Sequence, residues 1–335
     1  AILDGSKTAV VEGAWEIDSP VRIPSDFTLI LDGCHLRLAD GCYSNIFINE
    51  HHGTDIGKTP EGTDYNISVI GKNTPVLDGG EYNGLSEQTQ LKDGRPDIYN
   101  NCLIFFSNVK GFKIENILCH NNRWWAICFI HCSDGHISDI SFKSCDIWVD
   151  ENGVQHHGLS LPRYMEILVK TADGIDFRQG CHDIVVENIT GFIEDDTVAM
   201  TNLPGKLEDV FGVEGFTKDI YNITVKNLCS ASLCNAIRIL NQSGYKLHDI
   251  YIDGVTDMSA ALPYLERGGS SVRIGDLRAY GPIPATPENT YNITIKNVHS
   301  RAVATIVTCE EIGNLNFENI SAFDGSILID NKIAK

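Results

Sequence analysis

The stretch YNITIKNVHSRAVATIVTCEEIGNLNFENISAF, residues 291–323, contains one phrase twice, as ITIKNV at 293–298 and as LNFENI at 315–320. In both copies apolar residues alternate with polar ones and β-branched residues are frequent, which is typical of a β-strand. The aligned asparagines, Asn297 and Asn319, are 22 residues apart. A strand that returns after so short an interval, without a helical pattern between the copies, predicts a stacked repeat.

Variants of this phrase run through most of the chain. They are NISVIG at 66–71, FKIENI at 112–117, HISDISF at 136–142, IVVENI at 184–189, ITVKNL at 223–228 and DIYIDGV at 249–255. The aligned positions are 116, 139, 188, 227, 254, 297 and 319, so the intervals are 23, 49, 39, 27, 43 and 22 residues. The short intervals equal one turn of a coil, and the long ones equal a turn with an inserted loop, or two turns. We therefore predict an all-β, single-domain right-handed parallel β-helix over residues 1–335, with loop insertions.

Asparagine at a fixed place in each turn predicts a hydrogen-bonded ladder, because an amide can donate to one neighbour and accept from another. The ladder residues are Asn116, Asn188, Asn227, Asn297 and Asn319. The segments 85–101, 149–165 and 258–290 are poor in strand pattern, so we expect them to be loops. Loops on a rigid scaffold are common places for the walls of a binding site.

The composition limits the partners of the chain. The formal charge is −19, from 45 acidic and 26 basic residues, which argues against nucleic acid and anionic membrane surfaces. No stretch approaches the length of a membrane-spanning helix, and the N-terminus lacks a signal-peptide pattern. The eleven cysteines contain no CxxC pair, so we expect buried free thiols and favour a reducing, cytoplasmic compartment. No pattern requires a cofactor or a metal, and none indicates an oligomeric state.

The stretch TADGIDFRQGCHDIVVENITGFIEDDTVAM, residues 171–200, contains two clusters of carboxylates. Asp173 and Asp176 form the first cluster, and Asp195 and Asp196 form the second. Asp173 and Asp195 are 22 residues apart, which is one turn of the coil, so the clusters should lie on adjacent strands of one sheet. Hydrolysis of a glycosidic bond requires one carboxylic acid and one carboxylate, and crowding keeps one of them protonated. Turn residues or calcium ligands are the alternative interpretation.

These motifs resemble those of glycoside hydrolase family 28, the polygalacturonases and their relatives. The NTDGID motif of the family matches Thr171–Asp176 in part, and its GDD motif with the following apolar strand matches Glu194–Met200. Upstream, Trp124–Ile127 and the following FIHCSDGHISDISF resemble the aromatic segment that precedes NTDGID in the family. The resemblance implies an inverting glycosidase. In that interpretation Asp196 is the general acid, and Asp173 and Asp195 position and deprotonate the attacking water.

The basic residues do not decide whether the substrate sugar is acidic or neutral. The chain has no counterpart of the family's GHG motif; by register Asn235 takes the place of its histidine. The arginine of the family's RIK motif, which holds a substrate carboxylate, matches either Arg238, with Leu240 at the lysine position, or Arg273 in SSVRIG. Without that lysine, a neutral or branched oligosaccharide is as good a candidate as a galacturonate.

Five further residues are candidates for substrate binding: Asp176, Arg178, Trp124, Trp125 and His157. Arg178 either binds substrate or pairs with an acidic residue. The two tryptophans form a sugar-stacking platform or cap the core. His157 lies in the polar loop that precedes Asp173, where a solvent-facing position is the simpler interpretation.

Three rival functions remain on the same fold. A polysaccharide lyase would use the clustered Asp residues for calcium. An intramolecular glycosyl- or fructosyl-transferring enzyme would use the same carboxylates without consuming water. A carbohydrate-binding β-helix would need no acid cluster. All of these share an oligo- or polysaccharide as partner.

Overall fold

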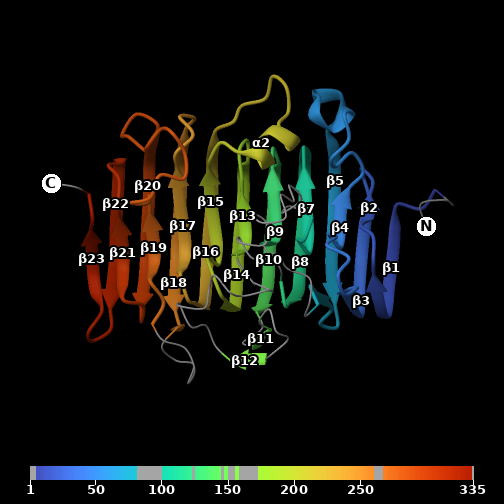
Figure 1. Cartoon of the computed structure of the whole chain (residues 1–335), viewed down its shortest axis with the longest axis horizontal. Coiled ribbons are helices and arrows are strands. Elements are labelled where there is room, and N and C mark those ends of the chain that lie inside the picture. Colours follow the sequence, from blue (N-terminus) through green and yellow to red (C-terminus); the bar gives the residue numbers. More distant parts are fainter. Residues whose placement is uncertain are drawn as a thin grey trace.

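The computed structural model describes residues 5–80, 100–122, 125–144, 147–149, 155–157, 173–259 and 267–333. The chain forms a parallel β-helix, as the repeat predicts. Each coil contributes one strand to each of two parallel sheets, and the coils stack along the long axis from the N-terminus to the C-terminus (Figure 1).

The first sheet, here called the long-strand sheet, contains the repeated phrase. Its strands are β1 (Thr8–Ile17), β3 (Thr28–Leu38), β5 (Asp64–Lys72), β6 (Val76–Asp78), β8 (Val109–His120), β10 (Ser133–Lys143), β14 (His182–Ile193), β16 (Ile220–Ser232), β18 (Leu247–Asp257), β20 (Thr290–Ser300) and β22 (Gly313–Ala322). Every predicted copy of the phrase lies in one of these strands.

The second sheet, the short-strand sheet, closes the coil. Its strands are β2 (Val21–Ile23), β4 (Phe47–Asn49), β7 (Ile104–Ser107), β9 (Trp125–Ile130), β13 (Asp173–Phe177), β15 (Val198–Asn202), β17 (Asn235–Asn241), β19 (Ser270–Ile274), β21 (Ala304–Thr308) and β23 (Ile327–Asn331). Strand β19 lies within 258–290, a segment whose sequence indicated a loop.

The remaining strands and helices lie in the segments that connect the strands of the two sheets. β11 (Ile147–Val149) and β12 (Gln155–His157) form an antiparallel pair, and β12 lies within the segment 149–165, which the sequence indicates as a loop. Two short 3-10 helices, η2 (Ile56–Lys58) and η3 (Pro60–Gly62), follow β4, and the helix α2 (Lys206–Phe211) follows β15. Helix α2 has no counterpart in the sequence-based prediction. No helix in the described ranges has the length and apolar character needed to cross a membrane.

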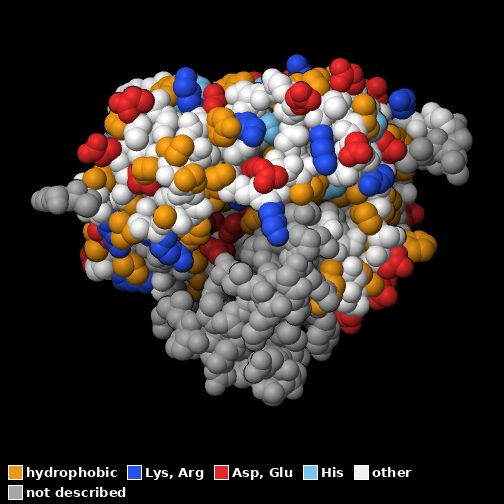
Figure 2. Space-filling view, turned by 45° about the horizontal axis from the view of Figure 1, so that its top comes forward, with side chains coloured by type: hydrophobic (Ala, Val, Ile, Leu, Met, Phe, Trp, Pro, Cys, Tyr) orange, Lys and Arg blue, Asp and Glu red, His pale blue; other side chains and the backbone are white. Residues whose placement is uncertain are grey.

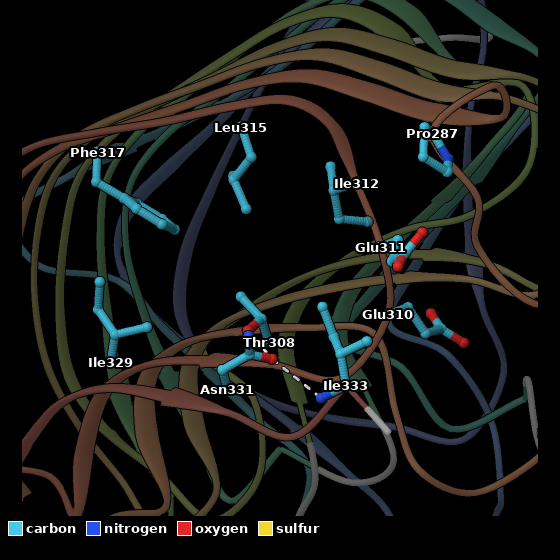
Figure 3. A pocket seen from close by; sticks show the side chains of 10 residues that line it. All are labelled: Pro287, Thr308, Glu310, Glu311, Ile312, Leu315, Phe317, Ile329, Asn331 and Ile333. Atoms are coloured by element: carbon cyan, nitrogen blue, oxygen red, sulfur yellow. Dashed lines mark hydrogen bonds between the residues drawn. The ribbon is translucent and has the colours of Figure 1, made fainter. Parts of the chain in front are cut away.

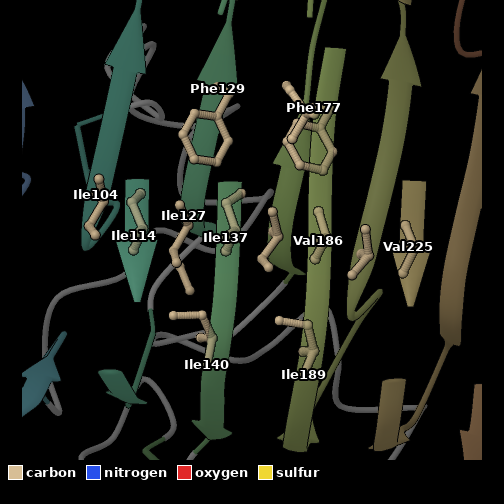
Figure 4. Packing of buried hydrophobic residues seen from close by; sticks show 14 of the residues in the cluster. Ile104, Ile114, Ile127, Phe129, Ile137, Ile140, Phe177, Val186, Ile189 and Val225 are labelled. Carbon is tan, nitrogen blue, oxygen red and sulfur yellow. The ribbon is translucent and has the colours of Figure 1, made fainter. Parts of the chain in front are cut away.

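Apolar side chains at equivalent positions of successive strands form columns, and these columns fill the core between the two sheets. Ile114, Ile137, Val186 and Val225 follow one another on neighbouring long strands, and all are fully buried. Figure 4 shows these side chains beside those of the facing short strands. The Phe129 ring stacks on the Phe177 ring of the next strand, with centroids 5.5 Å apart and planes 14° apart. Apolar burial of this kind, repeated in each coil, is the main stabilising contribution.

The core is open at its C-terminal end. A cavity lies beyond the last coil, and its lining includes the apolar side chains of Leu315, Phe317 and Ile329 (Figure 3). In the middle of the chain such inward-facing positions are covered by the next coil. This cavity is therefore an end of the core rather than a site built from polar groups.

The aligned positions lie at a bend in each long strand from β8 to β22. Residues 116, 139, 188, 227, 254, 297 and 319 all have positive φ, between 51° and 84°. Asparagine, aspartate and glycine tolerate this left-handed conformation better than other residues do. The Asn319 amide donates to Asn297 Oδ1 at 2.6 Å, and the Asn227 amide donates to Asn188 Oδ1 at 3.3 Å. These two links confirm the predicted ladder for Asn188, Asn227, Asn297 and Asn319, whereas the Asn116 amide donates to the Gly71 carbonyl. The bend in the backbone is a second reason for asparagine at this position.

The cysteines among the described residues are free thiols. Most of them are buried, including Cys102, Cys119, Cys128, Cys132 and Cys181. The prediction of buried free thiols is confirmed for these positions. Burial raises the pKa of the Cys102 thiol well above its usual range, so it stays protonated and behaves as a small apolar side chain.

The bend predicts an order of stability among variants of Asn297. This residue donates to Asp253 at 2.6 Å, accepts from Asn319 and has φ of 53°. Asn297→Ala should lower the free energy of unfolding by about 1–3 kcal/mol, because it loses both hydrogen bonds and strains the backbone. Asn297→Gly keeps the backbone freedom and should cost less. Urea denaturation of both variants checks this, and a glycine variant as unstable as the alanine variant would contradict the backbone explanation.

Candidate active site

One row of polar residues crosses three neighbouring short strands. Strand pairing aligns Ile175 with Val198 and Val198 with Ile237, so Asp173, Asp196 and Asn235 occupy equivalent places. The backbone N–H of Asp196 donates to Asp173 Oδ1 at 2.9 Å. The Asn235 amide donates to Asp196 Oδ1 at 2.6 Å. The structure thus places the two Asp clusters on adjacent coils, as expected, with Asp196 rather than Asp195 opposite Asp173.

The three carboxyl groups of Asp173, Asp195 and Asp196 converge. One oxygen from each lies within 4.8 Å of the others. Asp196 is 8% exposed, whereas Asp173 and Asp195 are partly accessible. Because Asp173 and Asp195 are partly accessible, a substrate atom can reach the cluster from solvent. Figure 2 shows acidic side chains in a hollow on the face of the molecule seen there.

Crowding and burial alter the protonation of these acids. Burial, with Asp195 and Asp173 nearby, raises the pKa of Asp196 well above its usual range. Burial, with Asp176 and Asp195 nearby, raises the pKa of Asp173 in the same direction. Two adjacent carboxylates in a low-dielectric site cannot both ionise easily, so the group retains protons near neutral pH.

Asp176 lies beneath the cluster. It is fully buried, and no described N–H or hydroxyl group donates to either of its carboxyl oxygens. Its carboxyl group is near enough to that of Asp173 to contribute to the raised pKa of Asp173. Burial raises the pKa of Asp176 to about 7, and the Arg178 guanidinium opposes this rise. The predicted substrate-binding role of Asp176 finds no exposed surface, and its contact is with Asp173.

Asn235 is oriented by its neighbours. The Ser270 hydroxyl donates to Asn235 Oδ1 at 2.6 Å, so the amide nitrogen faces Asp196. Asn235 therefore lies one coil after the Asp pair and in contact with Asp196, at the register that the sequence indicates. The Asn235 amide holds Asp196 Oδ1 as an acceptor and leaves Oδ2 as the oxygen that can carry a proton.

Two arginines lie side by side on the outer face of the sheet. Arg238 of β17 is in register with Arg273 of β19, so both candidates for the arginine position are present together. Arg238 donates to Asp276 Oδ2, and Arg273 Nη2 lies 3.5 Å from the same oxygen. Nε of each arginine is buried without a partner among the described residues. Asp276 was not predicted, although it follows Arg273 by only three residues.

Arg178 pairs with an acidic residue, which was one of its two predicted roles. Its Nε and Nη2 donate to Glu208 Oε1 at 3.1 and 2.8 Å. Its guanidinium also lies 5.3 Å from the centroid of the Trp125 ring. Trp125 is 9% exposed and packs in an apolar cluster with Phe211, so it caps this surface rather than offering a stacking platform. Glu208 lies in α2 and was not predicted.

Two predicted substrate-binding residues cannot be placed. Trp124 lies outside the described residues. For His157, the structure describes the backbone within β12 but not the side chain. Both remain predictions.

The same acids are the only described group of His, Cys, Asp and Glu that could hold a metal ion. Calcium binds oxygen ligands at about 2.3–2.6 Å, so oxygens within this spacing could share one ion. Asp196 Oδ1 and Asp173 Oδ1 already accept protein hydrogen bonds, from the Asn235 amide and from the Asp196 N–H. These hydrogen bonds favour a site that handles protons.

No family model matches the sequence, and no curated protein matches it significantly. Solved structures share the fold. An iota-carrageenase of family GH82 from A. fortis is 11% identical, with a TM-score of 0.56, and the match covers 98% of this chain and 82% of that chain. A polygalacturonase from Erwinia carotovora ssp. carotovora is 12% identical, with a TM-score of 0.54 and coverage of 97% and 87%. At these identities the likeness establishes the parallel β-helix alone.

A tailspike protein of E. coli bacteriophage HK620, solved with a pentasaccharide, is 11% identical with a TM-score of 0.58. The match covers 98% of this chain and 59% of the tailspike chain. This chain therefore spans a little over half of that protein.

Asp176 predicts a pH dependence of stability. Its folded-state pKa of about 7 is higher than the value of about 4 expected in the unfolded chain. The protonated group therefore favours the fold at low pH, and this contribution is lost as the pH rises from about 4 to about 7. Asp176→Asn, which remains neutral, should be more stable than the wild type at pH 8 by a larger margin than at pH 5.

Thermal unfolding at the two pH values measures this effect. Asp134→Asn is the matched control, because Asp134 is exposed and pairs only with Lys110 at 3.7 Å. Equal pH dependence in the wild type and Asp176→Asn would contradict the assignment.

Proposed function

We propose that this chain is a glycoside hydrolase in which Asp196 is the general acid and Asp173 and Asp195 hold the attacking water. The observation that carries the proposal is the convergence of three carboxyl groups from adjacent coils within 4.8 Å. Hydrolysis of an acetal needs a proton donor for the leaving oxygen and a carboxylate for water or for direct attack. A group of three supplies both functions.

We assign the proton donor to Asp196, as the family resemblance implies. Burial and the nearby acids raise its pKa well above the usual range, as a proton donor requires, and they raise the pKa of Asp173 in the same direction. Asn235 donates to Oδ1, so the proton belongs on Oδ2. This arrangement fixes which oxygen delivers the proton to the glycosidic oxygen.

The spacing supports a bound water. A water that donates to two oxygens at about 2.8 Å, with a near-tetrahedral angle, separates them by about 4.5 Å. One oxygen of Asp173 and one oxygen of Asp195 lie within 4.8 Å of each other, which is compatible with such a water. Water activated by these groups would invert the anomeric configuration. The short distance also favours a second candidate, direct attack with retention, because carboxyl groups of retaining enzymes lie about 5–5.5 Å apart and those of inverting enzymes about 6.5–9.5 Å apart.

The paired arginines favour an acidic sugar. Arg238 and Arg273 share one carboxylate, Asp276, so positive charge remains for a carboxylate or sulfate of the substrate. The net charge of −19 opposes such a ligand at long range. Salt screens that repulsion beyond about 8–10 Å, whereas the arginines would act in direct contact. A neutral or branched oligosaccharide is the alternative that this argument disfavours.

The structural neighbours agree with a carbohydrate ligand. They include proteins named as a carrageenase and a polygalacturonase and a tailspike solved with a pentasaccharide. Their shared fold supports the proposal only as an analogy. The site itself carries the argument.

The first test is hydrolysis of polygalacturonate, ι-carrageenan and a neutral galactan by the wild type and by Asp196→Asn. Loss of the general acid should lower kcat by a factor of about 10²–10⁴ on whichever polymer is cleaved. NMR of the first product reports its anomer and thus separates inversion from retention. Asp134→Asn is the control and should keep full activity.

Other outcomes point to the rival functions. An unsaturated product, with activity that disappears in EDTA and returns with calcium, would identify a lyase. Transfer without uptake of water from ¹⁸O-labelled solvent would identify a transferase. Binding without turnover of any polymer would leave a carbohydrate-binding protein.

The arginine pair gives a separate prediction. Arg273→Gln should raise KM for an acidic polymer by about tenfold to a hundredfold, because a charged hydrogen bond contributes about 1.5–3 kcal/mol. Its effect on a neutral polymer should be small. Arg37→Gln, on the long-strand sheet, is the control variant. Equal changes of KM on the acidic and neutral polymers would contradict a role in charge recognition.

A further inference from the structure

We propose that the loop of residues 276–281, which follows β19, binds a second anionic group of the saccharide through Arg278. This proposal rests on the saccharide-binding part of the proposed function and adds a subsite to it. The substrate is then an oligosaccharide with acidic groups on neighbouring sugar residues, one held by the pair Arg238 and Arg273 and one by Arg278.

Three arginines surround the carboxyl group of Asp276. Arg238 donates to Oδ2, and Arg273 Nη2 lies 3.5 Å from the same oxygen. Oδ1 instead accepts from the Arg278 backbone N–H at 2.9 Å, and Arg278 Nε lies 3.7 Å from it. Asp276 thus contacts the pair with one oxygen and Arg278 with the other, which favours separate places for two anions.

The cluster contains more positive than negative charge. In spite of burial, the Arg278 N–H and the Arg238 guanidinium lower the pKa of Asp276, so it stays ionised and neutralises one of the three arginines. Glu310 lies nearby, but burial raises its pKa, and its Oε1 already accepts from the Gln242 amide at 3.0 Å. The remaining guanidinium groups repel one another, and bound anions would relieve that repulsion.

Arg278 is the accessible member of the cluster. The side chains of Arg238, Arg273 and Arg278 are 9%, 21% and 76% exposed. Strands β17 and β19, which contain the first two, are one and two coils beyond Asp196, and Arg278 follows Arg273 past the end of β19. A saccharide that contacts the acids and the pair can therefore extend to Arg278 through solvent.

The loop is held in place by Gln242, which is buried. Its Oε1 accepts from the backbone N–H groups of Tyr280 and Gly281 at 2.6 and 3.0 Å, and its Nε2 donates to the Arg278 carbonyl at 3.1 Å. A Cβ at Gly281 would lie 2.1 Å from the Gln242 carbonyl oxygen, so this close approach requires glycine. A loop fixed before the ligand arrives loses less conformational entropy on binding.

Tyr280 restricts the Arg278 side chain. The guanidinium lies 4.9 Å from the centroid of the Tyr280 ring. Partial burial raises the pKa of the Tyr280 hydroxyl, Arg278 and Arg238 oppose this rise, and Asp276 and Asp195 add to it. The hydroxyl is thus within electrostatic reach of both the arginines and the acid cluster. Tyr280 is a positioning residue, because stacking orients the planar guanidinium that would bind the anion.

Calorimetric titration of Asp196→Asn, which should leave the saccharide intact, tests this subsite. The probes are tetragalacturonate, an ι-carrageenan tetrasaccharide and a neutral galactotetraose. Adding Arg278→Gln should raise Kd for the acidic probe that binds by about tenfold to a hundredfold, because a charged hydrogen bond is lost. Kd for the neutral probe should not change. Arg37→Gln, on the long-strand sheet, is the control.

Tyr280 variants separate positioning from direct contact. Tyr280→Phe keeps the ring and should keep the affinity for the acidic probe, whereas Tyr280→Ala should raise Kd by about twofold to fivefold. The matched control is Tyr65→Ala, because Tyr65 of β5 is 46% exposed and Tyr280 is 45% exposed. Equal loss in Tyr280→Phe and Tyr280→Ala would contradict positioning through the ring.

A double-mutant cycle decides whether there are one or two anion positions. The fold increases in Kd caused by Arg273→Gln and Arg278→Gln should multiply in the double variant if the arginines bind different anions. A double variant no weaker than the worse single variant would mean one shared anion and would overturn the second subsite.

The subsite and the hydrolase can fail separately. If Arg278→Gln leaves every Kd unchanged, or if no acidic tetrasaccharide binds, the subsite is wrong, and hydrolysis by the wild type would still support the proposed function. If acidic probes bind through Arg278 but the wild type cleaves no polymer, the subsite stands and the hydrolase is wrong. Thermal unfolding verifies that each variant is folded.

Discussion

Hydrogen bonding in register between successive coils is the constraint on which the rest of this structure depends. Each strand pairs residue by residue with the strands before and after it, so any position becomes a column along the molecule. The insertion between β10 and β13 shows how strict this register is. After that long connection, Asp173 and Ile175 still pair with Trp125 and Ile127 of the preceding coil. Loops can therefore vary while the columns stay in place.

The left-handed bend maintains this register within the long strands. The long strands from β8 to β22 change direction at the same aligned position, and residues such as Asn188 and Gly254 adopt positive φ there. Where asparagine occupies the bend, its amide also links neighbouring coils. Conformational preference and hydrogen bonding thus act at one position, which explains why the phrase is recognisable in the sequence.

The candidate site lies where charged residues occupy outward-facing positions of the short-strand sheet. Burying carboxylates disfavours their ionised forms, and nearby acids add to that effect. Part of this cost is offset by ion pairs such as Arg238 with Asp276 and Arg178 with Glu208. The same burial raises the pKa of Asp196 well above its usual range, which the proposed role of proton donor requires. Burial of these acids lowers the stability of the fold, and the proposed chemistry requires that burial.

The sequence by itself determined the coil, most strands of the long sheet, the asparagine ladder and the neighbourhood of the two Asp clusters. These features are local or periodic, so they can be predicted from the intervals between copies of the repeated phrase. Only the tertiary structure decided that Asp196 faces Asp173, that Asn235 holds Asp196 and that Arg238 and Arg273 lie together. It also decided that α2 covers the sheet and that Trp125 and Arg178 serve that packing. Such contacts depend on the length and path of each turn between strands, and no repeated pattern encodes these.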